Sequence, residues 1–255
     1  MMKPIKKLFQ HPFVIAHRGA SAYVPENTIS AFEAAVKMKA DMIELDIQLT
    51  SDGYWIVMHD LSLKRTCGLR KKVQSVTLGQ IKTLDAGSWF SPQFAGEKVP
   101  TLEELLTWAK HKVRLNLEIK GRVKKNSPAI PSLLKTLSKH GMGKEIILSS
   151  FDWKILRQVR ACDKKIALGL LVNRQPRYRY LREAIDLKAF SVNLPPHKLK
   201  KGVSEKIHRL KMVVWVYTLN SLPEVNQYLK MGIDGFFTNF PDLPVKKKIL
   251  FSRSG

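Results

Sequence analysis

Short apolar runs alternate with segments of helical periodicity along the chain. Nine runs predict strands, at residues 13–17, 42–48, 54–59, 113–119, 145–149, 166–171, 189–193, 212–217 and 235–238. Seven segments with apolar residues three and four positions apart predict helices, at residues 28–39, 101–110, 130–139, 153–160, 180–187, 204–209 and 222–229. Strands that alternate with helices pair in parallel. The pattern therefore predicts an α/β fold, a (β/α)8 TIM-type barrel with one additional strand.

Two of these strands, 42–48 and 54–59, are too close in sequence to be parallel. Five residues that end in Asp52 and Gly53 separate them, whereas a parallel crossover needs about a dozen residues or more. An Asp-Gly pair suits the tight turn of a hairpin. We therefore expect these two strands to be antiparallel.

Residues 61–100 fit no strand–helix unit of the barrel. At about 150 residues per domain, the 255 residues of the chain correspond to one large domain or two small ones. The segment is first basic and then rich in aromatic residues, and it ends at Pro100. We interpret it as a small insertion after the His59 strand, within a single barrel domain over residues 1–255, rather than as a second core.

The predicted strand 42–49 alternates apolar and polar residues. One face carries Ile43, Leu45, Ile47 and Leu49, and the other carries Met42, Glu44, Asp46 and Gln48. In a barrel, the first face packs against helices and the second points into the interior. Two buried carboxylates are costly unless a hard cation such as Mg²⁺ or Ca²⁺ neutralises them. An edge strand with its acidic residues facing solvent would give the same pattern.

Residues 113–120, which include the predicted strand 113–119, show the same alternation. This second case favours the interpretation in which the polar faces point into the barrel. One face carries Val113, Leu115, Leu117 and Ile119, and the other carries Arg114, Asn116, Glu118 and Lys120. In such barrels, functional residues collect at the carboxyl ends of the strands. Glu118 can therefore be a third metal carboxylate and Lys120 a phosphate anchor, although a lysine alone at this position would be interpreted as a surface residue.

Two histidines lie at the ends of predicted strands. His17 ends the first strand, and His59 ends the hairpin, where it is expected to lie across from about Glu44. A lone histidine is more often structural than catalytic. Two that converge beside three carboxylates favour an acidic catalytic site.

The composition is that of an ordinary globular protein, with 44% hydrophobic and 25% charged residues. Global disorder, collagen and coiled coil are excluded. Cys67 and Cys162 form no metal-spaced motif, which favours a reducing compartment. The basic segment Met1–Gln10 is followed by no apolar stretch, and no window holds the roughly 18 apolar residues of a membrane span. We expect a soluble cytoplasmic protein without a signal peptide.

The formal net charge of +23 is concentrated in the second half of the chain. Residues 1–120 hold 17 basic and 12 acidic side chains, whereas residues 121–255 hold 27 and 9. A basic face attracts phosphates on a small substrate, an anionic membrane or nucleic acid. A solvated basic surface with no such partner is the alternative. Nucleic-acid binding is not expected, because residues 174–180 are the one candidate element for it.

Ten motifs follow one another along nearly the whole chain. They are His17-Arg18-Gly19-Ala20, Pro25-Glu26-Asn27-Thr28, Glu44-Leu45-Asp46, Thr50-Ser51-Asp52-Gly53, Met58-His59-Asp60, Pro100-Thr101-Leu102-Glu103, Leu117-Glu118-Ile119-Lys120, Ser149-Ser150-Phe151, Gly232-Ile233-Asp234-Gly235 and Thr238-Asn239-Phe240-Pro241-Asp242. In this order they resemble the glycerophosphodiester phosphodiesterase family, in its soluble bacterial type.

The resemblance implies metal-dependent hydrolysis of glycerophosphodiesters to glycerol 3-phosphate and an alcohol. It implies one divalent ion, Mg²⁺ or Ca²⁺ with Mn²⁺ as a further candidate, and a barrel with an insertion after His59. The site residues that it implies are two acid–base histidines, three metal carboxylates and two phosphate-binding cations: His17 and His59; Glu44, Asp46 and Glu118; Arg18 and Lys120. The roles of the two histidines, and the choice of water or the glycerol 2-hydroxyl as nucleophile, stay open.

Two positions depart from the family pattern. Where the family usually has Trp-Thr near the end of a late strand, this chain has Tyr217-Thr218, and Trp215 lies two residues earlier. Tyr217 is therefore a candidate for the substrate pocket. Where the family has Thr-Asp before the late proline, this chain has Thr238-Asn239. Neither departure is expected to touch the metal ligands or the histidines.

Two other functions would suit the same fold. A lipid phosphodiesterase acting at a membrane would use the basic half of the chain, although no apolar anchor is evident. A non-catalytic anion- or lipid-binding barrel would have lost a histidine or a carboxylate of the site, and none is missing. The expected partner is a small glycerophosphodiester, with weak contact to an anionic membrane surface as an addition. The sequence makes no prediction of the oligomeric state.

Overall fold

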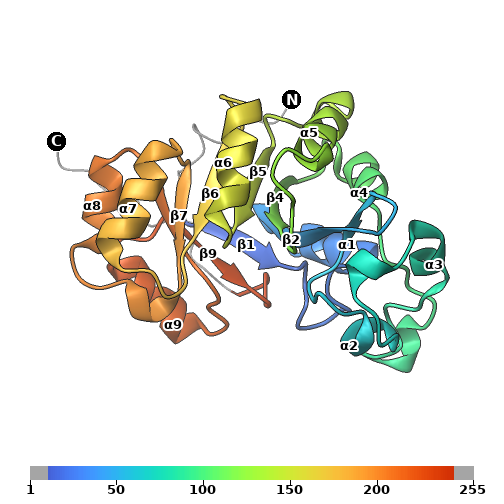
Figure 1. Cartoon of the computed structure of the whole chain (residues 1–255). Helices are drawn as coiled ribbons and strands as arrows, with labels where there is room; N and C mark the ends of the chain where they lie inside the picture. Colours follow the sequence, from blue (N-terminus) through green and yellow to red (C-terminus); the bar gives the residue numbers. More distant parts are fainter. Residues whose placement is uncertain (1–10, 244–255) are drawn as a thin grey trace.

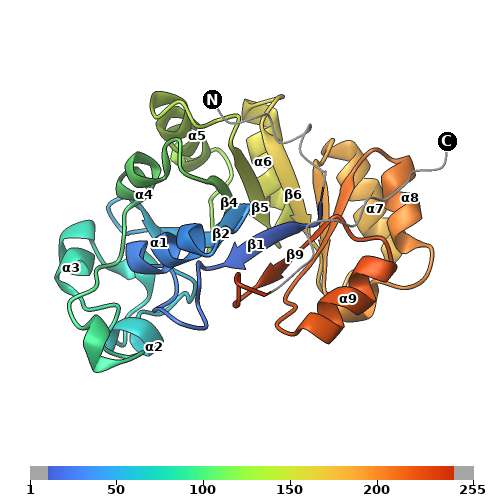
Figure 2. The same cartoon turned by 180° about the vertical axis from the view of Figure 1, so that it is seen from behind.

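The structure is a computed structural model, and it describes residues 11–243. Within this range nine strands form one sheet in the order β1-β9-β8-β7-β6-β5-β4-β2-β3, and an additional β1–β2 pairing closes it. Eight strands pair in parallel, and β3 pairs antiparallel with β2. The molecule is a (β/α)8 barrel with one additional strand, which confirms the prediction (Figure 1 and Figure 2).

The predicted strands and barrel helices are present, with ends that differ by at most three residues. The strands are β1 (Phe13–His17), β2 (Met42–Leu49), β3 (Trp55–Val57), β4 (Arg114–Ile119), β5 (Ile146–Ser150), β6 (Ala167–Leu171), β7 (Ser191–Leu194), β8 (Val213–Val216) and β9 (Gly235–Thr238). The barrel helices are α1 (Ile29–Lys37), α4 (Leu102–Ala109), α5 (Ala129–Lys139), α6 (Trp153–Cys162), α7 (Arg177–Asp186), α8 (Val203–Arg209) and α9 (Leu222–Lys230).

Strand β2 is longer than its neighbour β1, and this leaves room for β3. The β1 pairing covers Met42 to Glu44, whereas β3 pairs with Ile47 to Leu49. The antiparallel register opposes Ile47 to Val57 and Leu49 to Trp55, as the short connection predicts. Ile47 of β2 is thus paired on both edges, with Val57 of β3 and with Ile119 of β4.

The two faces of β2 separate as the alternation predicts. Ile43, Leu45 and Ile47 belong to the large apolar cluster between the barrel and its helices. Met42 belongs to a second cluster inside the barrel, with Phe13, Ile15, Ile147, Phe190, Trp215 and Phe237. Along β2 the interior therefore changes from apolar at Met42 to acidic at the next inward positions. This apolar floor lies beneath the polar end of the barrel.

Residues 61–100 hold two short helices that the sequence pattern did not predict, α2 (Lys64–Cys67) and α3 (Leu78–Thr83), and the 3₁₀ turns η2 (Val73–Ser75) and η3 (Pro92–Phe94). Helices of four and six residues are too short to show a period in the sequence. Their apolar residues pack with Ile56 and Met58 in a third cluster. This contact fixes the insertion beside β3.

None of the helices within residues 11–243 is long and apolar enough to cross a membrane. The segment 1–10, which the prediction about a signal peptide concerned, lies outside the described residues.

Candidate active site

Three carboxylates from two neighbouring strands meet inside the barrel. Glu44 and Asp46 are on β2 and Glu118 is on β4, where the register places Asp46 beside Glu118. One oxygen of each lies within 4.8 Å of the others. Their exposed fractions are 3%, 1% and 8%. The acidic residues therefore do not face solvent, and the interpretation of this strand as an edge strand is wrong.

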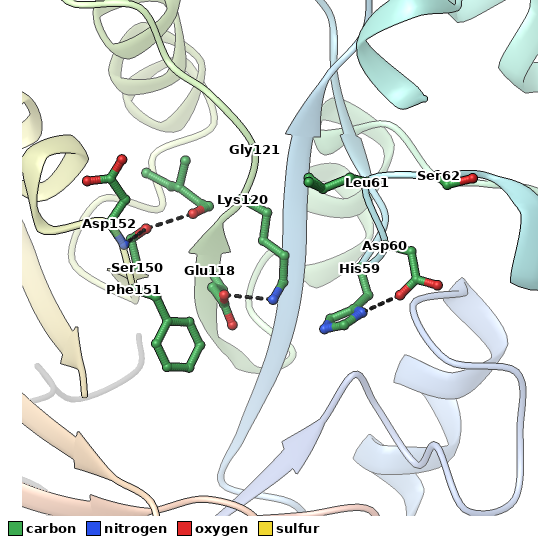
Figure 3. A pocket seen from close by; sticks show the side chains of 11 residues that line it. His59, Asp60, Leu61, Ser62, Glu118, Lys120, Gly121, Ser150, Phe151 and Asp152 are labelled. Carbon is green, nitrogen blue, oxygen red and sulfur yellow. Dashed lines mark hydrogen bonds and ion pairs between the residues drawn. The ribbon is translucent and has the colours of Figure 1, made fainter. Parts of the chain in front are cut away.

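Two cations compensate part of this charge. Lys120 Nζ lies 2.8 Å from Glu118 Oε1 and 3.3 Å from Asp46 Oδ1, so the lysine points into the site (Figure 3). Arg18 Nε lies 3.5 Å from Asp46 Oδ2. The Arg18 backbone N–H donates to Glu44 Oε2 at 3.1 Å. Two cations face three carboxylates, and this leaves one excess negative charge.

The buried carboxylates have perturbed acidities. Burial raises the pKa of Glu44 well above its usual range, and the charges of Asp46 and Glu118 add to this. Burial also raises the pKa of Glu118 to about 7, with Asp46 acting in the same direction. Burial opposes ionisation of Asp46 too, but Lys120 and Arg18 outweigh it and hold the pKa of Asp46 below its usual value.

This donor set fits a divalent cation. Asp46 Oδ1 is buried and accepts no hydrogen bond. Without an ion, burial and, after it, the negative charge of the neighbouring carboxylates raise the pKa of Glu44 and of Glu118. Carboxylate oxygens at this spacing are the ligands that Mg²⁺ and Ca²⁺ prefer. The three residues can therefore hold the metal that the sequence pattern implies.

Both predicted histidines line one cavity of about 240 Å³ with Arg18, Glu44, Glu118 and Lys120. His59 follows β3, and its Nδ1 lies 2.6 Å from Asp60 Oδ1. His17 is the last residue of β1, and its Nδ1 lies 2.7 Å from Asn239 Oδ1. Its Nε2 lies 3.9 Å from Glu44 Oε2. Each ring is thus held at its Nδ1 atom. The partner of His59 is a carboxylate, and the partner of His17 is a neutral amide oxygen.

The contact with Asn239 corrects one expectation. The Thr238-Asn239 departure was expected to touch neither histidine, and this is wrong. Strands β1 and β9 are parallel neighbours with Ala16 opposite Thr238, so the residue after each lies beside the other. Burial lowers the pKa of His17 to about 4, and the Arg18 charge acts in the same direction.

Sequence reasoning assigned no role in the site to Asn27 and Glu26, which both contact site residues. The Asn27 Nδ2 donates to Asp46 Oδ2 at 2.9 Å, and its Oδ1 accepts from the Asp46 backbone N–H at 3.3 Å. Glu26 Oε1 accepts from Arg18 Nη1 at 2.9 Å. Both residues belong to the motif 25–28, and this position in a motif was the one signal that could have indicated them.

Aromatic side chains form the remaining wall of the cavity. The Tyr217 ring lies 5.8 Å from that of Phe151 and 6.2 Å from that of Phe237, both edge-on. Its hydroxyl donates to the backbone carbonyl of Val172. Tyr217, the candidate pocket residue, therefore lines the cavity that holds the histidines.

A wider groove of about 590 Å³ continues outward from the cavity. Its walls include Leu61 and Ser62 of the insertion, Gly121 after β4, and Asp152 (Figure 3). The groove and the cavity share four lining residues, His59, Glu118, Lys120 and Phe151. These residues mark the junction between two spaces that could hold the two sides of one substrate.

Gly19 allows the loop that carries Arg18 to pass against α1. Its φ is +85°, and a Cβ there would lie 2.7 Å from the backbone C and O of Ala31. We expect Gly19→Ala to lower the free energy of unfolding by about 2–4 kcal/mol, since strained φ and overpacking add. Denaturant titration measures this. Gly53→Ala is the control, since its φ is +86° with no atom within 4 Å of the Cβ. If both variants lost the same free energy of unfolding, the contact with α1 would be excluded as the cause of the destabilisation.

Comparison with known proteins identifies the family of the chain. The profile of the Glycerophosphoryl diester phosphodiesterase family matches residues 17–243. A glycerophosphodiester phosphodiesterase of Caldanaerobacter subterraneus is 38% identical over 234 residues, which cover 90% of this chain and 94% of that protein. One of Bacillus subtilis is 37% identical over 254 residues, with coverages of 92% and 85%.

Among solved structures, the chain resembles an Oleispira antarctica phosphodiesterase in complex with the product sn-glycerol-3-phosphate. The TM-score is 0.83 at 26% identity, and the alignment covers 91% of this chain and 94% of that one.

Proposed function

Because the chain belongs to the glycerophosphoryl diester phosphodiesterase family, we propose that it hydrolyses small glycerophosphodiesters to glycerol 3-phosphate and an alcohol. The observation that carries this proposal is the single cavity lined by two histidines, two carboxylates of the acidic cluster and two cations. A non-catalytic barrel would have no need of this convergence.

We place one divalent cation, Mg²⁺, Ca²⁺ or Mn²⁺, on Glu44, Asp46 and Glu118. When bound, such an ion neutralises phosphoryl oxygens and lowers the pKa of a bound hydroxyl or water. Lys120 and Arg18 then have fewer carboxylate charges to balance. Their side chains line the cavity, so they can bind the remaining phosphate oxygens, for which the guanidinium group of Arg18 has suitable geometry.

We assign different roles to the two histidines from their Nδ1 partners. Burial lowers the pKa of His59, and the hydrogen bond to the Asp60 carboxylate acts against this. Asp60 thus supports the charged imidazolium that a general acid needs. The neutral Asn239 oxygen at His17 accepts Nδ1–H, which leaves the Nε2 lone pair free to act as a general base. His17 then takes the proton of the nucleophile, and the nucleophile oxygen forms a bond to phosphorus. The bond from phosphorus to the leaving oxygen breaks, and His59 protonates that oxygen.

The two spaces suit the two sides of the substrate. The inner cavity, with its aromatic wall at Tyr217, would hold the glycerol phosphate. The outer groove would hold the alcohol. Because the volume of the groove is about 590 Å³, it restricts the size of the alcohol little. His59 lines both spaces, and a general acid belongs at this junction.

The test is release of choline from glycerophosphocholine and of ethanolamine from glycerophosphoethanolamine, each with glycerol 3-phosphate measured in the same sample. Equal amounts of alcohol and glycerol 3-phosphate support the proposal. Release of phosphocholine instead, or cleavage of intact phospholipid only, would assign a different reaction to the site. A cytoplasmic location stays a prediction.

We propose that the basic half attracts anionic substrate, with weak contact to an anionic membrane surface, and does not build the site. The loops after β4, β6 and β7, residues 121–127, 172–176 and 195–202, carry seven Lys and Arg and no Asp or Glu. Of the seven, all but Lys198 are exposed. These loops follow the carboxyl ends of the strands, where the site also lies.

This proposal predicts a salt effect on kcat/KM. Steering acts over a Debye length of about 8–10 Å, so kcat/KM for an anionic glycerophosphodiester should fall severalfold as salt rises while kcat stays nearly constant. Changing Arg174, Arg177 and Arg179 together to Gln should reduce this dependence and weaken binding to anionic vesicles. The control changes Lys144, Lys164 and Lys165, exposed between helices and the following strands, to Gln. Arg174 lies in the loop after β6, and Arg177 and Arg179 lie in the first turn of α7. A loss of kcat in the arginine variant would place this segment in the active site.

A further inference from the structure

Arg65 of the insertion joins two carboxylates at the edge of the site. Its Nε and Nη2 donate to Asp60 at 2.7 and 3.1 Å. Its Nη1 and Nη2 donate to Glu26 at 2.9 and 2.7 Å. The planar guanidinium thus makes a two-point contact with each partner, a geometry that lysine cannot reproduce.

Each of these carboxylates holds a residue that lines the cavity. Asp60 Oδ1 lies 2.6 Å from His59 Nδ1. Glu26 Oε1 accepts from Arg18 Nη1 at 2.9 Å. Arg65 therefore reaches His59 through one intermediate residue, Asp60. It reaches the phosphate-binding Arg18 through another, Glu26. It connects the loop after β1, the end of the hairpin and α2.

The guanidinium is itself fixed by the insertion. Its Cζ lies 5.4 Å from the centroid of the Trp89 ring, and Trp89 Nε1 donates to the Ala86 carbonyl at 2.9 Å. The hydrogen bonds from Arg65 lower the pKa of Asp60 to about 2. Asp60 therefore stays ionised at working pH, as it must to accept a hydrogen bond from the His59 ring.

Arg65 lines neither the cavity nor the outer groove formed by the described residues. We propose that Arg65 is a positioning residue, which holds His59 through Asp60 and Arg18 through Glu26, and that this is the contribution of the insertion to the reaction. The proposal rests on the proposed function for its kinetic test, but the contact of Arg65 with Asp60 can be measured without turnover.

The kinetic test is Arg65→Met with a glycerophosphodiester as substrate. A small displacement of catalytic groups costs up to about 10² in rate, so we expect kcat to fall about 10- to 100-fold. We expect KM to rise less than about threefold, since Arg65 does not touch the substrate and reaches the phosphate-binding Arg18 through Glu26. Arg65→Lys should recover part of the rate. Arg157→Met is the control, because it removes another paired arginine, on Glu183, away from the site.

A double-mutant cycle separates positioning from a general loss of stability. If Arg65 acts through Asp60, then Arg65→Met combined with Asp60→Asn should lower kcat little more than the worse single variant does. The proposal would be overturned if the effects of the two substitutions on kcat multiplied in the double variant. It would also be overturned if Arg65→Met left kcat unchanged or raised KM alone. Thermal unfolding of each variant confirms that the folded protein is compared.

The second measurement needs no activity. In a ¹⁵N-labelled protein, the His59 ring Nδ1–H should give a hydrogen-bonded proton signal, assigned with His59→Gln. Arg65→Met should broaden or remove this signal, and Arg157→Met should not. An unchanged signal in Arg65→Met would overturn the proposal even if the turnover of that variant were reduced. If the wild type hydrolyses no glycerophosphodiester, the proposed function fails, and this signal still decides the role of Arg65.

Discussion

Removal of divalent metal should reduce hydrolysis by at least about 10³-fold, since a bound ion supplies several kcal/mol of charge stabilisation. The reason lies in the three buried carboxylates, whose ligand oxygens all lie within 4.8 Å of one another and which two cations balance only in part. The assay follows glycerol 3-phosphate after chelation and after separate addition of Mg²⁺, Ca²⁺ and Mn²⁺. Full activity of the metal-free protein would contradict the assignment of these carboxylates.

A stability measurement checks the same site without turnover. A saturating ion at 100 times its dissociation constant stabilises the folded state by about 2.7 kcal/mol, so the wild type should unfold at higher temperature with metal. Glu118→Gln should lose this gain. Its metal-free form should be no less stable than the wild type, because one of three crowded carboxylates is neutralised. The control is Glu103→Gln, an exposed position on α4, which should keep the full gain from metal.

His17→Ala and His59→Ala should each lower kcat by at least about 10², since a general acid or base contributes roughly 10²–10⁴. Both residues line the cavity and lie at strand ends, so thermal unfolding should change little. His197→Ala, an exposed histidine after β7, is the control. If both cavity variants turn over normally, the acid–base pair lies elsewhere.

The leaving group distinguishes the two histidines. A p-nitrophenyl ester of glycerol phosphate needs little protonation of its leaving oxygen, so His59→Ala should recover most of its rate on this substrate. His17→Ala should not, because the nucleophile still needs a base. The opposite result would reverse the roles that the partners Asp60 and Asn239 indicate.

The two histidines also show what a departure from a family motif can mean. From the sequence, Asn239 in place of the usual Asp was expected to lie away from the histidines. The structure places its Oδ1 at 2.7 Å from His17 Nδ1. The departure therefore changes the charge next to one catalytic candidate.

The sequence alone determined the fold and the acidic centre. Alternation with period two on residues 42–49 and 113–120 assigns Glu44, Asp46 and Glu118 to one face, and any barrel of parallel strands turns that face inward. The short connection between β2 and β3 excludes a parallel crossover, which decides the hairpin. These conclusions need only the spacing of residues along the chain and the length of the connection between two strands, and the sequence gives both directly.

The tertiary structure alone decided which groups hold the candidate catalytic side chains. Asn239 meets His17 across 222 positions, and Arg65 meets Glu26 across 39. The short helices of the insertion, which carry Arg65, have no period to predict them and are packed by the cluster around Ile56 and Met58. Arg65 is one of 44 basic residues. Neither the composition of the chain nor the spacing of Arg65 from its neighbours distinguishes it from the others. Such contacts depend on the order of strands around the barrel and on the paths of its loops, because these bring together residues that share no local pattern.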